Sequence, residues 1–446
     1  MDLSEQKVPI TANQPEMHAG GRFDAEAGSV VSCSAGSAYE KENKENKICL
    51  TPAGKRALLI LGGVVIVVIL AVMIFKKPAA EKKPKETESP AAAATTPAPE
   101  PEPVETKAEF FFTGDALIHG TVWMDADLGN GSYDFRPIVE NVGRLSEGYD
   151  LKYYNQETIL GGTELGLHGY PTFNSPQEVG DAMVDMGFRL VSTANNHSLD
   201  QGLMGINRSC EYWKRQADQY GVHMDGTYDS REDHDSLPVY EINGITYTFL
   251  SWTYGCNGLL PPEGYEYIVN IYTDHVDELI EKVKAADQIS DVVILAMHWG
   301  TEYSMEANDE QRELSRRLSE AGADIIVGNH PHVIQPIEWV NDHKTIVYYA
   351  MGNMVSAQID EPNLVGMVGG LTIRKVTKGD DVTITLEDPR ADLIYTYYDV
   401  GYKNFKVIPM KELDDAHVPG AAALYEKYLP KINEYDDSIR VGVELN

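Results

Sequence analysis

The sequence from residue 108 onward predicts an α/β fold. Short runs rich in β-branched and aromatic residues alternate there with amphipathic segments, an order typical of α/β domains. Asn243-Gly244 separates the apolar runs 239–242 and 245–250, which is a strong β-hairpin signal. In the segment 274–286, apolar residues recur at helical spacing and share one face. The predicted helices cover residues 177–186, 203–219, 274–286 and 308–321.

Residues 1–107 have the composition of an anchored tether. Residues 1–56 are polar and predict a disordered cytoplasmic tail, which is either simply solvated or binds a partner. Residues 57–75 carry no charge, and as a helix they would rise roughly 28 Å, so they predict a transmembrane helix. The long preceding tail disfavours a cleaved signal peptide. Residues 76–107 are rich in Pro, Ala, Glu and Lys and predict an extended linker.

The overall composition excludes some classes of partner. The chain has 446 residues, enough for one large domain with extensions, and a formal net charge of −32. We therefore expect no binding to nucleic acid, and no anionic membrane bound through a basic face. Cys210 and Cys256 form either a disulfide or, as we favour, two free buried thiols. Basic residues flank residues 57–75 on both sides, so charge alone does not fix the orientation of this segment.

Six apolar runs stop abruptly at residues of metal-binding or acid/base type. In an α/β sheet, buried strands carry such runs, and their carboxyl ends open into a crevice where ligand-binding side chains converge. Glycines beside several of these polar residues permit tight turns and close backbone approach. One such junction means little, but six in one domain predict a site. The junctions lie at Asp115, Asn155-Gln156-Glu157, Asn195-Asn196-His197, His298, His330-Pro331-His332 and Gly352-Asn353.

The residue types at these junctions predict a metal site. Two carboxylates, an amide and three imidazoles supply a mixed nitrogen and oxygen set for one or two divalent ions, such as manganese, zinc, iron or calcium. Taken singly, most of these residues could be helix caps, turn formers or structural histidines. Two histidines around Pro331 have few structural uses. The candidate metal ligands are Asp115, Glu157, Asn196, His298, His330 and His332.

At these residues the sequence resembles the CapA family of capsule or poly-γ-glutamate synthesis proteins, over roughly residues 108–372. That family in turn resembles the calcineurin-like metallophosphoesterases, whose fold is a four-layer αββα sandwich around a dinuclear metal centre. The matching motifs are Thr113-Gly114-Asp115, Asn155-Gln156-Glu157, Ala194-Asn195-Asn196-His197, His298-Trp299-Gly300-Thr301-Glu302-Tyr303, Gly328 through Gln335-Pro336-Ile337-Glu338, and Tyr349 through Gly352-Asn353.

The resemblance implies a role for each candidate residue. The sequence departs from the phosphoesterase pattern at Leu117, where a histidine is usual, and from the CapA pattern at Gln156, where a leucine is usual. His197 would be the general acid. By resemblance, Asp115 and His332 are ligands of a first metal, Glu157 is the bridging carboxylate, and Asn196, His298 and His330 are ligands of a second metal.

The resemblance also implies a function and a location. We expect a membrane-anchored, metal-dependent hydrolase or transferase acting on a cell-surface polymer, with its large domain outside the cell. The expected partners are that polymer and other membrane proteins of a capsule synthesis complex. The alternatives are a non-catalytic scaffold subunit of a polymer synthesis and export complex, or a plain metallophosphoesterase. We expect the metal-binding domain to span residues 108–375, with residues 376–446 as an extension packed on it.

Overall fold

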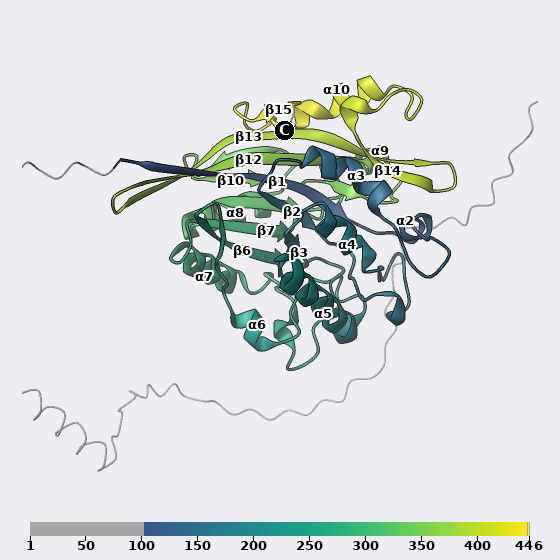
Figure 1. The fold of residues 1–446 in the computed structure, drawn as a ribbon, viewed down its shortest axis with the longest axis horizontal. Helices are drawn as coiled ribbons and strands as arrows, with labels where there is room; N and C mark the ends of the chain where they lie inside the picture. Colours follow the sequence, from purple (N-terminus) through teal and green to yellow (C-terminus); the bar gives the residue numbers. More distant parts are fainter. Residues whose placement is uncertain (1–101, 444, 446) are drawn as a thin grey trace, which may run out of the picture. The chain divides into compact units, whose positions relative to one another are not determined.

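A computed structural model describes residues 102–443 and 445, which form a mixed α/β fold with two β-sheets (Figure 1). The α/β class predicted from the sequence is confirmed. The nine-stranded sheet has the order β14-β13-β12-β1-β2-β3-β4, with β11 pairing β1 and β15 pairing β13. Its strands are β1 Val104–Ala116, β2 Leu151–Asn155, β3 Leu190–Ser192, β4 His223–Asp225, β11 Asn353–Val355, β12 Val365–Lys378, β13 Asp381–Asp399, β14 Lys403–Pro409 and β15 Arg440–Val441.

The six-stranded sheet has the order β5-β6-β7-β8-β10-β9. Its strands are β5 Tyr240–Ile242, β6 Ile245–Thr253, β7 Val292–His298, β8 Ile325–Asn329, β9 Ile337–Val340 and β10 Thr345–Tyr348. The described helices are α2 Gly120–Asp125, α3 Arg136–Leu145, α4 Glu178–Asp185, α5 Gly202–Tyr220, α6 Arg231–Asp235, α7 Val276–Asp287, α8 Asp309–Ala321, α9 Glu361–Leu364 and α10 Ala421–Ile432, with short 3-10 turns at Thr163–Leu165, Glu266–Ile268 and Met410–Glu412.

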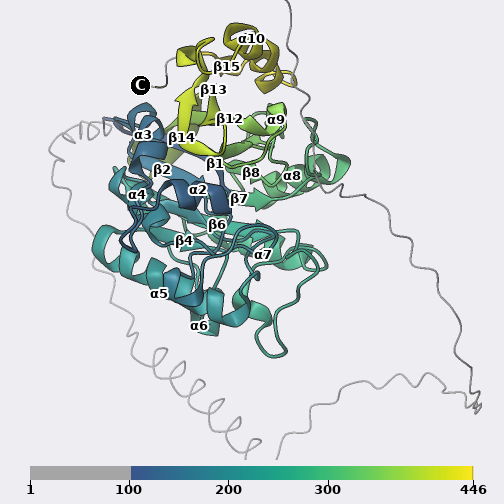
Figure 2. The ribbon, with the colours of Figure 1, turned by 90° about the vertical axis from the view of Figure 1, so that its right-hand side faces the viewer.

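The two sheets pack face to face. Side chains alternate between the faces of a strand, so Phe110 and Phe112 of β1 point one way and Phe111 the other. The ring of Phe112 contacts Tyr348 of the second sheet, with 4.4 Å between ring centroids. Phe111 instead joins the cluster that helices α3, α4 and α5 form on the outer face. Helices α7 and α8 cover the outer face of the second sheet, so the strands lie between two helical layers (Figure 2).

The parallel strands bring polar residues to one edge of each sheet. Strands β1 to β4 are parallel neighbours in the first sheet, and β6, β7, β8 and β10 in the second. The carboxyl ends of parallel neighbours lie together. This arrangement gathers the predicted junctions, because Asp115 lies near the end of β1, Glu157 follows β2, and His298 ends β7.

The predicted local structure agrees closely with the observed elements. The predicted hairpin is present, and Asn243 and Gly244 both have positive φ, 50° and 79°, as a tight hairpin turn requires. The four predicted helices correspond to α4, α5, α7 and α8. Helix α7 begins at Val276 rather than at the expected Asp274, because Asp274 has a φ of 67°, in the left-handed region that a right-handed helix excludes.

Two expected boundaries need correction. The linker was expected to reach residue 107, but β1 begins at Val104 and pairs with β12 as far as Thr377. The domain was expected to end at residue 375, which lies inside β12. Strands β13 and β14 extend the same sheet, and α10 lies beside β13 (Figure 1). Leu424 and Tyr428 of α10 belong to the same hydrophobic cluster as Phe110 and Phe112 of β1. Residues 376–443 are therefore an integral part of the fold.

The predicted cytoplasmic tail 1–56, the predicted transmembrane helix 57–75 and nearly all of the predicted linker lie outside the described residues. Within residues 102–443 and 445, no helix has both the length and the apolar character needed to span a bilayer.

His223 of β4 makes stability depend on pH. Its ring stacks on Tyr240 at 3.5 Å between centroids, and burial lowers its pKa from the ordinary 6.5 to about 4. The unfolded chain therefore takes up this proton at a higher pH than the folded chain, and the folded state loses stability as pH falls from 6.5 to about 4. Denaturant titrations across this window should show a shallower loss for His223→Gln than for the wild type; an equal loss would contradict this assignment.

Candidate metal centre

Two wholly buried carboxylates lie side by side at the ends of β1 and β2. Asp115 pairs with Asn353 of β11 and with Asn155 of β2 in the sheet register. Its Oδ1 accepts a hydrogen bond of 2.8 Å from Nδ2 of Asn155. Both carboxylate oxygens of Glu157, in contrast, are buried without any hydrogen-bond partner. Burial raises the pKa of Glu157 well above its ordinary value, and the neighbouring His332 only partly offsets this effect.

His332 lies between these carboxylates. Its Nδ1 is 3.4 Å from Oδ2 of Asp115, and its Nε2 is 3.6 Å from Oε1 of Glu157. Burial acts to lower the pKa of His332, but the charges of Glu157 and Asp115 outweigh it and raise the pKa to about 9. One ligand atom from each of these three residues fits within 4.8 Å of the others. The three side chains could therefore hold a metal ion.

Asn196, which follows β3 of the first sheet, and His298 and His330 from the ends of β7 and β8 of the second sheet extend this group. Oδ1 of Asn196 is 2.9 Å from Nε2 of His298, which is itself 3.7 Å from Oε1 of Glu157. The rings of His298 and His330 lie 4.9 Å apart. Burial lowers the pKa of His298 well below its ordinary value and that of His330 to about 3. Both rings are therefore neutral at physiological pH, the form that ligates metals.

The two histidines around Pro331 reach this position through unusual backbone geometry. The φ angles of His330 and His332 are 98° and 58°, in a region that residues other than glycine rarely adopt. The backbone N–H of His330 also lies 3.4 Å from Oδ2 of Asp115. Such strained residues concentrate at functional sites, where the surrounding structure holds them in place. All six predicted ligands are thus brought into one cluster.

Buried polar atoms without hydrogen-bond partners indicate that this cluster can hold a cation. Buried polar atoms nearly always have hydrogen-bond partners, so exceptions require an explanation. Both oxygens of Glu157 and the Nδ1 atoms of His298 and His330 are buried without partners. A bound cation would supply the missing interaction of the two Glu157 oxygens. Carboxylate, amide and imidazole donors suit the divalent ions considered above, and the donor set does not single out one of them.

His197 stands beside this cluster with a fixed ring orientation. Its Nδ1 is 2.8 Å from Oδ2 of Asp200, and the edge of its ring meets Phe173 at 4.7 Å between centroids. Oδ2 of Asp200 also accepts from the backbone N–H of Phe173. His197 lies close enough to His298 and His330 for its charge to contribute to their lowered pKa values. The His197–Asp200 pair is therefore positioned to move a proton at the edge of the cluster.

Further residues contact the candidate ligands, although the sequence predicted no role for them. Oδ1 of Asn353 accepts a 3.0 Å hydrogen bond from Nδ1 of His332, and the ring of Tyr254 lies 4.6 Å from that of His330 at a tilt of 47°. Tyr254 follows the apolar strand β6, so the rule that located the other junctions could also have found it. The ring of His119 lies 5.3 Å from that of Phe173, and partial burial lowers the pKa of His119 to about 4.

Cys210 and Cys256 are both free and buried, in agreement with the alternative that was favoured for them. Sγ of Cys256 lies 3.7 Å from the backbone oxygen of Asn195, and Sγ of Cys210 lies 4.0 Å from Oγ1 of Thr227. Burial raises the pKa of each thiol to about 12. Neither thiol is therefore a reactive nucleophile.

Comparison with known proteins identifies relatives of this chain. The relative named "PGA biosynthesis protein CapA", from Bacillus subtilis (strain 168), is 34% identical over 185 residues, covering 39% of this chain and 44% of that protein. The relative named "Capsule biosynthesis protein CapA", from Bacillus anthracis, is 29% identical over 187 residues, covering 42% of this chain and 44% of that protein. The chain thus spans less than half the length of these two relatives.

Among solved structures, a novel phosphatase from Mycoplasma pneumoniae matches with a TM-score of 0.38 and 14% identity, covering 64% of this chain and 95% of that one. A similarity at this level does not indicate a function. The family model described as "Bacterial capsule synthesis protein PGA_cap" matches residues 109–358, which is more than half of the chain and includes all six predicted ligands. The chain therefore belongs to the family of bacterial capsule synthesis proteins, as its motifs predicted.

Proposed function

We propose that this protein is a membrane-anchored, metal-dependent hydrolase or transferase that acts on a cell-surface polymer during capsule or poly-γ-glutamate synthesis. The observation that carries the proposal is Glu157, a wholly buried carboxylate whose two oxygens have no hydrogen-bond partner. It lies between His332 at 3.6 Å and His298 at 3.7 Å. Burying a carboxylate without hydrogen-bond partners is costly unless a cation completes the group.

The candidate ligands divide into two sets that share Glu157. Asp115 and His332 form one set, and Asn196, His298 and His330 form the other. Each set with Glu157 offers enough donors for one divalent ion, so the centre can take one or two ions of manganese, zinc, iron or calcium. When bound, such ions supply Lewis acidity toward an acyl or phosphoryl oxygen and favour deprotonation of an attacking water.

His197 is the proposed general acid. The hydrogen bond between its Nδ1 and Oδ2 of Asp200, 2.8 Å long, fixes the orientation of the ring. The remaining ring nitrogen, Nε2, can then give its proton to the leaving group, which makes departure of an amine or alkoxide easier. Phe173 holds the ring from its edge and limits the access of water to the pair.

Anchoring and location follow the same proposal. The uncharged segment 57–75 would cross the membrane, and residues 76–103 would hold the folded domain away from it on the outer face. The proposed partners are the cell-surface polymer and other membrane proteins of a capsule synthesis complex. The formal charge of −32 supports the expectation that nucleic acid is not a partner.

The test compares two matched histidines in the full-length protein. His197 and His417 each bind an aspartate three residues away through Nδ1, at 2.8 and 2.6 Å, but His417 is on the surface of the C-terminal part. We expect His197→Gln to lower the rate of glutamate release from a poly-γ-glutamate oligomer by about 10²–10⁴-fold. Metal content by elemental analysis should stay unchanged, and His417→Gln should match the wild type.

Other outcomes identify the alternatives. A purified protein without metal that still supports polymer synthesis in cells would favour the scaffold. Turnover of a generic aryl phosphate, with no action on the polymer, would favour a plain phosphoesterase. Leu117 argues against the latter, because this buried apolar residue stands where phosphoesterases carry a histidine ligand.

A further inference from the structure

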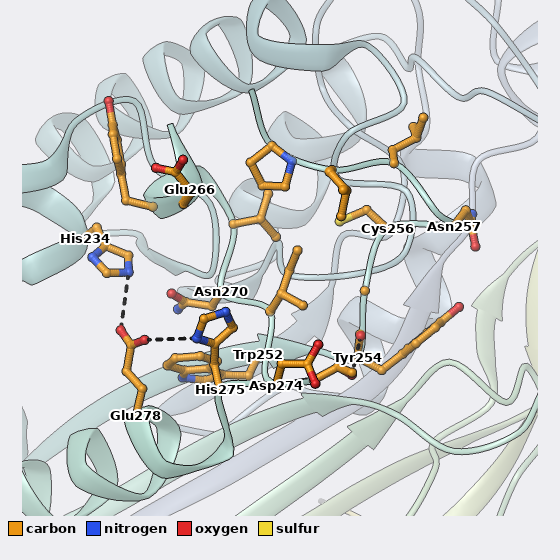
Figure 3. Close-up of a pocket in the computed structure, with 18 of the residues that line it drawn as sticks. His234, Trp252, Tyr254, Cys256, Asn257, Glu266, Asn270, Asp274, His275 and Glu278 are labelled. Carbon is orange, nitrogen blue, oxygen red and sulfur yellow. Dashed lines mark hydrogen bonds and ion pairs between the residues drawn. The ribbon is translucent and has the colours of Figure 1, made fainter. Parts of the chain in front are cut away.

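A cavity of about 630 Å³ adjoins the metal centre and has no part in the proposed chemistry (Figure 3). Its volume is in the range of pockets that hold small ligands. Tyr254 and Asn257 line one end of it. The ring of Tyr254 lies 4.6 Å from that of His330, and Oδ1 of Asn257 accepts a 3.3 Å hydrogen bond from Nδ2 of Asn196. One end of the cavity therefore borders two candidate metal ligands.

The other end of the cavity is rich in hydrogen-bond acceptors. Figure 3 places Glu278 between His234 and His275, away from Asn257. The carboxylate of Glu278 approaches these rings only to 4.0 and 3.9 Å. Asn270 lines the cavity and is 2% exposed, yet its Oδ1 has no partner. The half-exposed carboxylate of Glu278 and the unpartnered amide oxygen of Asn270 suit a ligand that donates several hydrogen bonds, as an ammonium group does.

A guanidinium group stands at the same end. Arg231 and His234 lie three positions apart on α6, and both line the cavity. The guanidinium of Arg231 lies over the ring of Tyr267, 4.8 Å from its centroid. No carboxylate of the described residues lies within ion-pair distance of it. Arginine is well suited to bind a carboxylate through two parallel hydrogen bonds, so Arg231 is available for an anionic group of a ligand.

We propose that this cavity binds an α-amino-acid head group, with the ammonium near Glu278 and Asn270 and the carboxylate at Arg231. In a γ-linked glutamate chain, only the amino-terminal residue carries both a free ammonium and an α-carboxylate, since every other nitrogen is an amide. The cavity would therefore select the end of the chain and direct it toward the metal centre. This assignment rests on the proposed function for the identity of the polymer, but binding of the head group can be measured without turnover.

The experiment is calorimetric titration of the full-length protein in detergent with three small probes. Glutamate carries both groups, glutarate lacks the ammonium, and 4-aminobutyrate lacks the α-carboxylate. We expect glutamate to bind at least 10-fold more tightly than either analogue. Arg231→Gln should reduce glutamate to the affinity of 4-aminobutyrate, and Glu278→Gln should reduce it to that of glutarate. The control is Arg208→Gln, because Arg208 is paired with Glu164 at 2.9 Å outside the cavity and its loss should change nothing.

The same titration on His332→Ala separates this inference from the proposed function. This variant lacks a candidate metal ligand, so glutamate binding that persists in it cannot come from chelation at the metal centre. Equal affinities for the three probes, or an Arg231→Gln variant that binds like the wild type, would overturn the site. Selective glutamate binding in a protein that holds no metal and shows no turnover would support the site and count against the proposed function. Circular dichroism of each variant verifies that it is folded.

Discussion

Replacing Glu157 by Gln should abolish metal binding without weakening the metal-free fold. The substitution keeps the shape of the side chain and removes the charge that His332 and His298 face. Loss of a ligand of this kind should reduce metal affinity by about 100-fold or more. The stability of the metal-free protein should stay equal or rise by up to about 2 kcal/mol, because a buried carboxylate without hydrogen-bond partners is removed.

The measurement is denaturant unfolding with and without added manganese or zinc. A metal at 100 times its dissociation constant raises the free energy of unfolding by about 2.7 kcal/mol if it binds only the folded state. The wild type should show this gain, and Glu157→Gln should not. Glu164→Gln is the control, since Glu164 is exposed and paired with Arg208. A Glu157→Gln variant that is less stable without metal, and equally stabilised by metal, would mean that Glu157 has only a structural role.

The centre could be predicted because its residues share a local signal. Each ligand follows a buried apolar run, and parallel strands bring such positions to one edge. Asp115 and Glu157 follow neighbouring strands of one sheet, and His298 and His330 follow neighbouring strands of the other. What the sequence does not contain is the packing of the two sheets, which brings Glu157 within 3.7 Å of His298. The residues could be named in advance, whereas their division into sets came only by resemblance.

The features that were missed depend on contacts between distant segments. Val104 reads as part of a linker because its neighbours are charged, yet it pairs with Thr377, far along the chain. The C-terminal strands are hard to recognise for a similar reason, since the first nine residues of β13 are exposed or half-buried and the strand is held by pairing with β12 and β14. Neither Arg231 nor Glu278 has an informative neighbourhood in sequence. Their cavity exists because α6 and α7 meet beside β6, as the bond from Lys282 to the backbone oxygen of His234 illustrates.

Gly114→Ala should destabilise the protein by about 3 kcal/mol and disturb the metal centre at the same time. A Cβ at this position would lie 1.9 Å from the carbonyl oxygen of Gly352, which also accepts a 3.0 Å hydrogen bond from the backbone N–H of Asp115. The clash would join the new Cβ to backbone atoms of Gly352, so no side-chain rotation can relieve it. Strand β1 must therefore move away from β11, and Asp115, the next residue, must move with it.

Gly255→Ala provides the matched control. A Cβ on Gly255 meets nothing within 4 Å, and its backbone is outside the left-handed region. We expect its free energy of unfolding to stay within about 0.5 kcal/mol of the wild type. For Gly114→Ala, metal affinity measured on the folded fraction should also fall, because the distance between Asp115 and His332 depends on where β1 meets the turn before β11. If Gly114→Ala unfolds and binds metal like the wild type, then the close approach of β1 to Gly352 does not position Asp115, and the centre must tolerate movement of its first carboxylate.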